Sequence, residues 1–198
     1  VTDVLDLTGG TGNVGLGSGS LGTALTTGTD NVAIGENAGD ALTTGSDNAF
    51  VGDNAGGAAT TGSDNVAVGS AALLVNTTGG SNIAIGSNAL DANTTGARNI
   101  AIGYDALSAN TTANNNTAVG NASLDANTDG TANTAVGRNA LGANTTADNN
   151  TAVGFNSLLT NTTGTKLTAL GSISLDANTT AEENTAIGYN AAGATTTG

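Results

Sequence analysis

Hydrophobic positions recur along this chain with a fixed period of 17 residues. The tripeptide Ala-(Ile/Val)-Gly and its close variants form ten copies in register, and an earlier copy ends at Gly17, 18 residues before the first of them. A short repeat in strict register is typical of a solenoid, in which each coil buries its apolar face by stacking on its neighbours. The repeat glycines are Gly35, Gly52, Gly69, Gly86, Gly103, Gly120, Gly137, Gly154, Gly171 and Gly188.

Each repeat predicts a short β-strand just before its glycine. The residue preceding the glycine is always aliphatic, and the one before that is Ala in nine copies, with Phe50 as the exception. The third residue before the glycine is Val, Ala or Ile in the first five copies and Thr in the last five. Such runs favour strands. One face is aliphatic and the other carries only Ala and Gly, so we expect both faces to be packed, as in parallel sheets.

The rest of the repeat predicts a second short strand and a turn. The fourth residue after the glycine is Leu in seven copies, and we expect a strand around it. Farther along, Asn-Thr-Thr-Gly and its variants indicate the turn between coils, where Asn side chains can hydrogen-bond to their stacked equivalents. No recurrence at three and four residues supports a helix, and the frequent Gly and Asn oppose one.

Composition narrows the classes of function. The 198 residues include 31 Gly but no Pro, Cys, Met, Trp or His. Without His or Cys there is no Ser-His-Asp or Cys-His nucleophile, no usual zinc site and no disulfide. The net charge of -13, with only three basic residues, argues against nucleic acid and anionic membranes as partners. Few large apolar residues and this charge would together indicate disorder, but disorder needs no such register.

The predicted architecture is an all-β parallel solenoid (β-roll) of about eleven 17-residue coils. We expect residues 1–12 to form an N-terminal cap or lead-in and residues 13–198 to form the solenoid. Parallel strands stack about 4.8 Å apart, so the rod is on the order of 50 Å long. In a single thin stack, each coil buries only a few aliphatic side chains, and the free energy gained by this burial is small beside the conformational entropy lost by ordering 17 residues. Because the small Ala and Gly face would let further chains approach closely, we predict a homo-oligomer and favour a trimer.

The motif Asn-(Val/Ile/Thr)-Ala-(Ile/Val)-Gly carries a resemblance to known proteins. It resembles the head repeat of YadA-type trimeric autotransporter adhesins, and it is similar to repeats of phage tail-fibre proteins. The resemblance implies a left-handed β-roll with three chains around one axis, no membrane insertion in this segment, and attachment to a host-surface receptor or glycan. The protein would then be extracellular, on a virion tail fibre or a bacterial cell surface. The copies include residues 31–35, 65–69, 82–86, 99–103 and 184–188.

The repeat here departs from that family in length, because the adhesin head repeat is shorter. We therefore expect the Asn-Thr-Thr turn to form an enlarged outer loop, and no ligand surface of the family can be carried over. The sequence also begins without Met, which suggests a processed product or a fragment of something longer.

A column of Thr residues, eight after each repeat glycine, offers an alternative function. It runs from Thr43 to Thr196 without interruption. A flat, evenly spaced Thr ladder is typical of ice-binding β-solenoids. The competing interpretation is that Thr packs well in stacked turns and hydrogen-bonds to its neighbours.

Asp30, Asp47 and Asp64 are the candidate metal ligands. They occupy equivalent positions in Thr-Gly-(Thr/Ser)-Asp-Asn, similar to the Gly- and Asp-rich turns that bind calcium. The same position becomes Arg98 and Lys166 farther along, so any calcium site would be confined to the first three turns. A solvated acidic edge explains the column equally well, and no other metal or cofactor is expected.

The large residues offer candidate surface contacts. Tyr104, Phe155 and Tyr189 each follow a repeat glycine directly, a position that we expect to face outward and that suits receptor contacts. Scattered exposed aromatics are also ordinary. By contrast, Phe50 replaces an inner Ala where the Leu column holds Gly39 and Gly56, which indicates a local exchange of volume.

Enzyme function is not expected, and no catalytic residue is assigned. The even repeats leave no insertion from which a cleft could be built, and few aromatics are present to stack a sugar ring against a carboxylate pair. The sequence favours a structural or adhesive fibre segment, with ice binding as the alternative.

Overall fold

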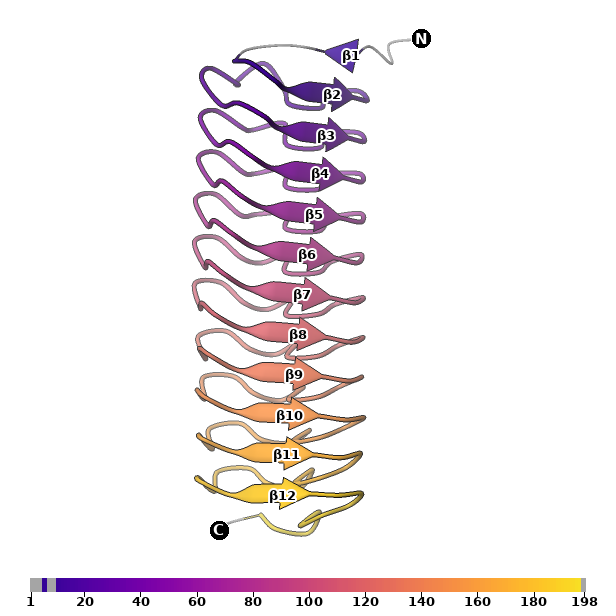
Figure 1. Ribbon diagram of the computed structural model, residues 1–198, viewed down its shortest axis with the longest axis vertical. Helices are drawn as coiled ribbons and strands as arrows, with labels where there is room; N and C mark the ends of the chain where they lie inside the picture. Colours follow the sequence, from indigo (N-terminus) through magenta and orange to yellow (C-terminus); the bar gives the residue numbers. More distant parts are fainter. Residues whose placement is uncertain (1–4, 7–9, 197–198) are drawn as a thin grey trace.

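The computed structural model describes residues 5–6 and 10–196 of the chain, and it shows one parallel β-solenoid (Figure 1). A single 12-stranded sheet runs along the rod with its strands in sequence order. The strands are β1 Leu5–Asp6, β2 Val14–Leu16, β3 Val32–Ile34, β4 Ala49–Val51, β5 Val66–Val68, β6 Ile83–Ile85, β7 Ile100–Ile102, β8 Thr117–Val119, β9 Thr134–Val136, β10 Thr151–Val153, β11 Thr168–Leu170 and β12 Thr185–Ile187.

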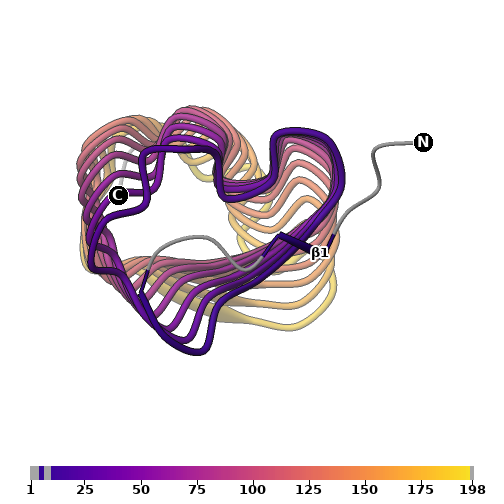
Figure 2. The same ribbon diagram turned by 90° about the horizontal axis from the view of Figure 1, so that it is seen from above.

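The register of the sheet matches the repeat. Thr134 of β9 lies beside Thr151 of β10, 17 residues on, and all pairs from β2 to β12 are parallel. Seen from above, successive coils lie over one another and turn gradually about the axis (Figure 2). The predicted all-β solenoid with 17-residue coils is therefore confirmed.

The N-terminal end of the sheet differs from the rest. Strand β1 pairs with β2 in the antiparallel sense, with Leu5 beside Leu16 and Asp6 beside Gly15. This pairing covers the backbone edge of β2, which would otherwise be open to another strand. The predicted lead-in of residues 1–12 includes 1–4 and 7–9, which lie outside the described residues.

The predicted second strand is wrong. The segment after each glycine is a series of turns, because the second and fourth residues after the glycine both have left-handed backbone angles. In one coil, φ is 55° at Asn88 and 53° at Leu90. Left-handed residues at alternate positions bend the chain instead of extending it. The bends bring the Leu side chain into the interior.

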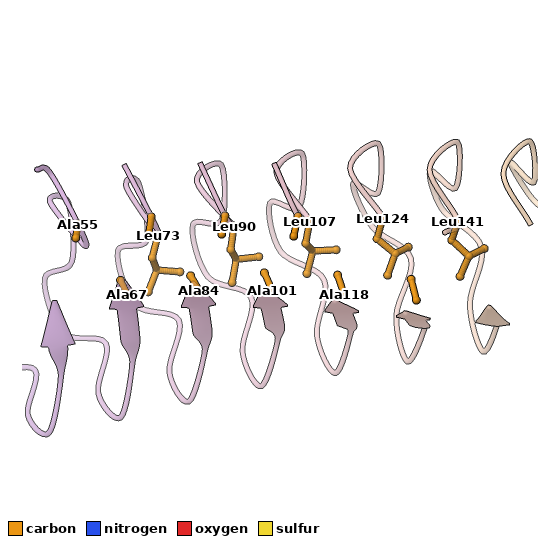
Figure 3. Close-up of a cluster of buried hydrophobic side chains, with 14 of the residues drawn as sticks. Ala55, Ala67, Leu73, Ala84, Leu90, Ala101, Leu107, Ala118, Leu124 and Leu141 are labelled. Atoms are coloured by element: carbon orange, nitrogen blue, oxygen red, sulfur yellow. The ribbon is translucent and has the colours of Figure 1, made fainter. Parts of the chain in front are cut away.

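The core lies between the strand and these turns (Figure 3). Ala84 and Ala101 point inward from their strands, Leu90 and Leu107 come from the opposite side of the coil, and all four are fully buried. The Ala face of the strand is therefore the interior of the solenoid. The expectation that this face receives other chains is wrong, because the Leu column of the same chain covers it.

Phe50 is the one large residue among the inner Ala positions, and it is fully buried. A Cβ added to Gly39 would lie 2.8 Å from its ring, and one added to Gly56 would lie 2.6 Å from it. The ring thus fills the space that Leu side chains fill in other coils. The predicted exchange of volume is confirmed.

Two ladders of buried Asn run along the rod. In the first, four residues before the glycine, the Oδ1 of Asn99 accepts the backbone N–H of Asn116 at 3.0 Å, and the Asn116 Nδ2 donates to the Gly130 carbonyl. In the second, seven residues after the glycine, the Asn110 Nδ2 donates to the Asn93 Oδ1 at 2.9 Å. The predicted hydrogen bonds between stacked Asn residues are confirmed. They satisfy polar groups that have no access to water.

The repeat glycines mark the bend that ends each strand. From Gly35 to Gly188 their φ values lie between 127° and 141°, a region that side chains rarely adopt. In Gly86, an added Cβ would also collide with the carbonyl oxygen of Gly103 in the next coil. The spacing between coils therefore requires glycine at this position.

Candidate functional surface

The described part of the chain offers no pocket and no group of three acidic side chains that could hold a metal ion. It also contains no helix able to cross a membrane. The features that remain to be described lie on the outer surface of the rod.

The largest candidate surface is the outward side of the sheet, which we call the outer face. It consists of the first and third residues of strands β2 to β12, because the middle residue of each strand points inward. The third residue is aliphatic throughout and partly or largely exposed, for example 39% at Ile34 and 68% at Ile187. Since the strands are adjacent, these side chains form one continuous apolar stripe.

The outer face changes in character along the rod. In β3 to β7 the first residue is aliphatic, as in Val32 and Ile100, whereas β8 to β12 all begin with Thr. The N-terminal half is thus apolar in both columns, and the C-terminal half pairs a column of hydroxyls with an aliphatic column. Continuous exposed apolar surfaces are typical of interaction sites, so the outer face is the first candidate for a functional surface.

Beside the outer face lies a second surface, formed by residues that directly follow the repeat glycines in the C-terminal half. We call it the aromatic ridge and define it by the six residues that occupy this position in successive coils. Tyr104, Phe155 and Tyr189 are 54%, 46% and 79% exposed, as the sequence predicts for this position. The Arg138 guanidinium lies 5.9 Å from the centre of the Phe155 ring, one coil away. The six residues are Tyr104, Asn121, Arg138, Phe155, Ser172 and Tyr189.

The Thr column proposed for ice binding is used within the fold. The Thr43 Oγ1 donates to the Thr60 carbonyl at 2.9 Å, and the Thr60 Oγ1 donates to the Thr77 carbonyl at the same distance. Equivalent bonds continue to Thr179 in the described coils, Thr111 excepted. These hydroxyls therefore stabilise coil stacking and do not form a free ladder.

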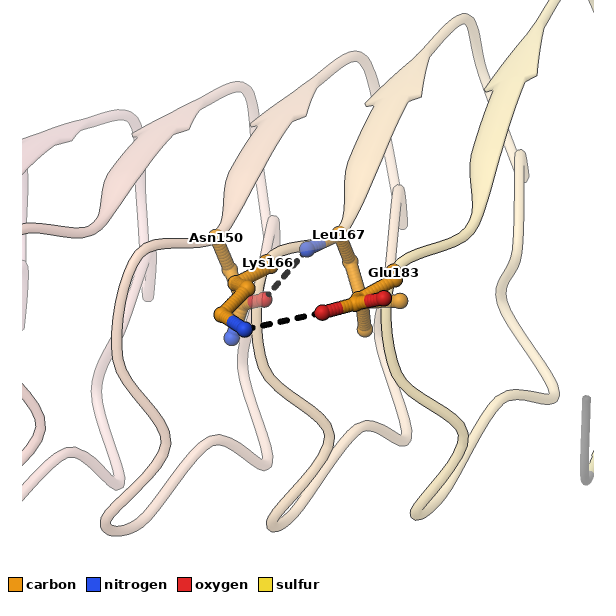
Figure 4. Close-up of polar contacts among 4 residues, drawn as sticks. All are labelled: Asn150, Lys166, Leu167 and Glu183. Carbon is orange, nitrogen blue, oxygen red and sulfur yellow. Dashed lines mark hydrogen bonds and ion pairs between the residues drawn. The ribbon is translucent and has the colours of Figure 1, made fainter.

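Asp30, Asp47 and Asp64 are all exposed, and their φ values are 59°, 59° and 60°. Asp tolerates this left-handed conformation better than most residues, which gives the column a conformational role. Near the C-terminus, Lys166 and Glu183 occupy the equivalent position in two successive coils. The Lys166 Nζ lies 2.8 Å from the Glu183 Oε1 (Figure 4). Because both side chains are exposed, this pair contributes little stability.

A partly buried acidic group escaped the sequence analysis. Burial raises the pKa of Asp91 and of Asp125 above the ordinary value of 3.8, and the charge of Asp105 raises both further, although backbone hydrogen bonds oppose the shift. Both residues stand five after a repeat glycine. Asp recurs at this otherwise variable position, and this recurrence could have indicated the partly buried acidic residues from the sequence.

The exposure of the aliphatic columns also escaped the sequence analysis. Two aliphatic residues flank one Ala in Val66–Val68 and in Ile83–Ile85, and neighbouring strand residues point to opposite faces. The alternation shows that the aliphatic residues and the Ala residues lie on opposite faces of the strand. It does not show which of the two faces points into the interior.

Comparison of the chain with protein-family models, with curated proteins and with solved structures finds no match.

Proposed function

We propose that this chain is a structural and adhesive segment of an extracellular fibre, either a phage tail fibre or a bacterial surface adhesin, and that it is not an enzyme. The β-solenoid supplies a stiff shaft, because every coil is hydrogen-bonded to the next along the rod. The absence of a pocket in the described coils leaves the surface to carry the function. The resemblance to YadA-type head repeats and tail-fibre repeats supports this choice.

The observation that carries the proposal is the outer face, which we assign to self-association. The stripe is on the order of 50 Å long and about 10 Å wide, from the usual spacings of strands and residues. Stable interfaces bury about 800 Å² per partner, so the stripe together with its flanking residues approaches the size of one. A second copy is the natural occupant, because the stripe runs along the rod and two parallel rods can match it over its full length.

Three chains around one axis is the arrangement that the resemblance implies. A closed symmetric assembly would repeat every surface group around the rod as well as along it. Weak contacts to a host-surface receptor or glycan would then add through multivalency. This is how a shaft without a deep binding site can attach firmly.

Sedimentation-velocity ultracentrifugation tests the proposal, because it resolves a monomer of 18.7 kDa from its trimer. We expect a homotrimer for the unchanged chain and a monomer for Ile85→Glu/Ile102→Glu, because two carboxylates in the stripe would be buried without partners. Thr78 and Thr95 are exposed, lie one coil apart and do not belong to the outer face, so Thr78→Glu/Thr95→Glu is the matched control and should leave the trimer intact. A folded monomer of the unchanged chain would overturn the proposal.

Ice binding through the Thr column is the competing function. Its hydroxyls already donate to backbone carbonyls, as in the 2.9 Å bond from Thr43 to Thr60, so nothing in this column favours ice as a ligand. Thermal hysteresis at micromolar protein concentration would favour ice binding over the fibre function.

A further inference from the structure

We infer that the aromatic ridge binds a neutral linear polysaccharide that lies along the rod. This inference rests on the proposed function, since it names the chemical class of the surface to which the fibre attaches. It concerns a different set of residues from the outer face, so the two can be tested separately.

The spacing of the aromatic residues along the rod suits a polymer of sugar units. Coils rise about 4.8 Å each, and one hexose unit of an extended polysaccharide is of similar length. Tyr104 and Phe155 are 51 residues apart and Phe155 and Tyr189 are 34 apart, which corresponds to three coils and two coils. The rings are therefore about 14 Å and about 10 Å apart along the axis. An extended polymer of hexose units that follows the gradual turn of the coils (Figure 2) can meet all three rings.

The side chains of the ridge also suit a sugar ligand chemically. Sugar rings carry a face of C–H groups that packs on aromatic rings, and their hydroxyls seek amide and hydroxyl partners. The positions between the aromatic residues hold an exposed Asn121 and a partly exposed Ser172, which offer both donors and acceptors. Apolar faces that bear the ligand, with a few polar groups that orient it, are the usual composition of a binding site.

The charge of the protein favours an uncharged ligand. The chain has a net charge of -13, and the ridge itself carries only one cation, Arg138, which lies over Phe155. Long-range repulsion therefore disfavours nucleic acids and anionic polysaccharides. No pocket of the described residues encloses a small ligand, so affinity has to come from several weak contacts along one polymer.

Affinity electrophoresis tests the inference. The protein is run in native gels that contain hydroxyethylcellulose, laminarin, galactomannan or dextran, and a glycan array covers further neutral linear chains. We expect retardation by at least one of them, and binding at least about tenfold weaker in Tyr104→Ala/Phe155→Ala/Tyr189→Ala. Tyr104→Phe/Tyr189→Phe keeps the rings and should still bind.

The control variant is Ser70→Ala/Ser87→Ala. Like the residues of the ridge, Ser70 and Ser87 directly follow a repeat glycine, in two coils that precede the ridge. It should bind as the unchanged chain does. Absence of binding to every probe would overturn the inference, and so would binding that the triple variant retains. Sedimentation velocity of the triple variant separates the two proposals. An intact trimer that no longer binds supports the ridge as a ligand site, whereas dissociation would make it part of the self-association surface and overturn the inference.

Discussion

At the residue scale, the solenoid turns each position of the repeat into a column of near-identical environments. A residue that departs from its column can then be compared directly with its neighbours above and below. Phe50 departs because it is large where the column holds Ala, and Ile173 departs because it is β-branched where the column holds mostly Asn or Ala. Each exception predicts a specific change in stability.

Phe50→Ala is expected to lower the free energy of unfolding by about 3–5 kcal/mol, because it leaves a cavity in the core. Gly56→Leu alone should also destabilise, since an added Cβ already lies 2.6 Å from the Phe50 ring. Combined, the two changes reproduce the arrangement of other coils, where Leu faces Ala. Chemical denaturation of the single and double variants measures the coupling, and additive losses would contradict the volume exchange.

Ile173→Asn is expected to stabilise the protein by about 1 kcal/mol, because Ile173 has a φ of 50° and a β-branched side chain is strained there. Asn tolerates this conformation and occupies the same column at Asn139, Asn156 and Asn190. The reciprocal change, Ala122→Ile, should destabilise by a similar amount, because Ala122 also has a φ of 50°. Thermal unfolding decides, and a lower midpoint for Ile173→Asn would contradict the strain.

At the element scale, coils are held together by strand pairing and by the two Asn ladders. The first ladder is interrupted once, by Leu167, whose backbone N–H still donates to the Asn150 Oδ1 at 2.9 Å (Figure 4). Leu167 has no side-chain oxygen to accept the backbone N–H of Asn184 in the next coil, as Asn116 does for Asn133. The ladder therefore tolerates an interruption near the C-terminal end of the rod.

An interruption in the middle is expected to cost more. Asn116→Ala removes the acceptor of the buried Asn133 N–H and one of the two donors to the Gly130 carbonyl, to which the Asn127 Nδ2 also donates. Leaving the Asn133 N–H unpaired costs about 1–3 kcal/mol, so the midpoint of denaturation should fall clearly. Asn121 lies on the surface, and Asn121→Ala is the control that should change little. Equal effects of the two substitutions would argue against the ladder as a source of stability.

At the scale of the whole molecule, acidic charge opposes the folded state at neutral pH. Burial holds the pKa of Asp91 and Asp125 above 3.8, so the folded protein binds protons more tightly than the unfolded chain. The stability that these protons provide is complete below 3.8, the unfolded value, and is lost as the pH rises through the raised pKa. The net charge of -13 adds repulsion in the same direction.

The protein should therefore melt at a higher temperature at about pH 4.5 than at about pH 7. Asp91→Asn/Asp125→Asn should raise the midpoint at neutral pH and reduce the gain on acidification. Asp47→Asn/Asp64→Asn changes the net charge equally at exposed positions and provides the comparison. Circular dichroism melts measure all three proteins, and identical pH responses would show that general repulsion, not the two partly buried carboxyls, causes the effect.

The amino-acid sequence alone was enough to predict the period, the position of the strand before each repeat glycine and the pairing of the stacked Asn residues, but it predicted a second strand where the structure has turns. These features arise from local rules: β-branched runs extend, and only glycine fits the φ of 138° at Gly103 beside the next coil. The size of each side chain can also be compared with those at the same position of the neighbouring repeats. The exchange of volume between Phe50 and the glycines Gly39 and Gly56 could therefore be predicted from the residues themselves.

Contacts between coils, by contrast, determine which face of the strand is interior and how the chain bends after each strand. Leu90 and Leu107 adopt a φ of 53° against their own preference, because the bend carries their side chains over the Ala column of the same chain. That conformation is stabilised by packing in three dimensions, which no local propensity reports. It places Ala inside and leaves the aliphatic columns of β2 to β12 on the surface, where the function is proposed.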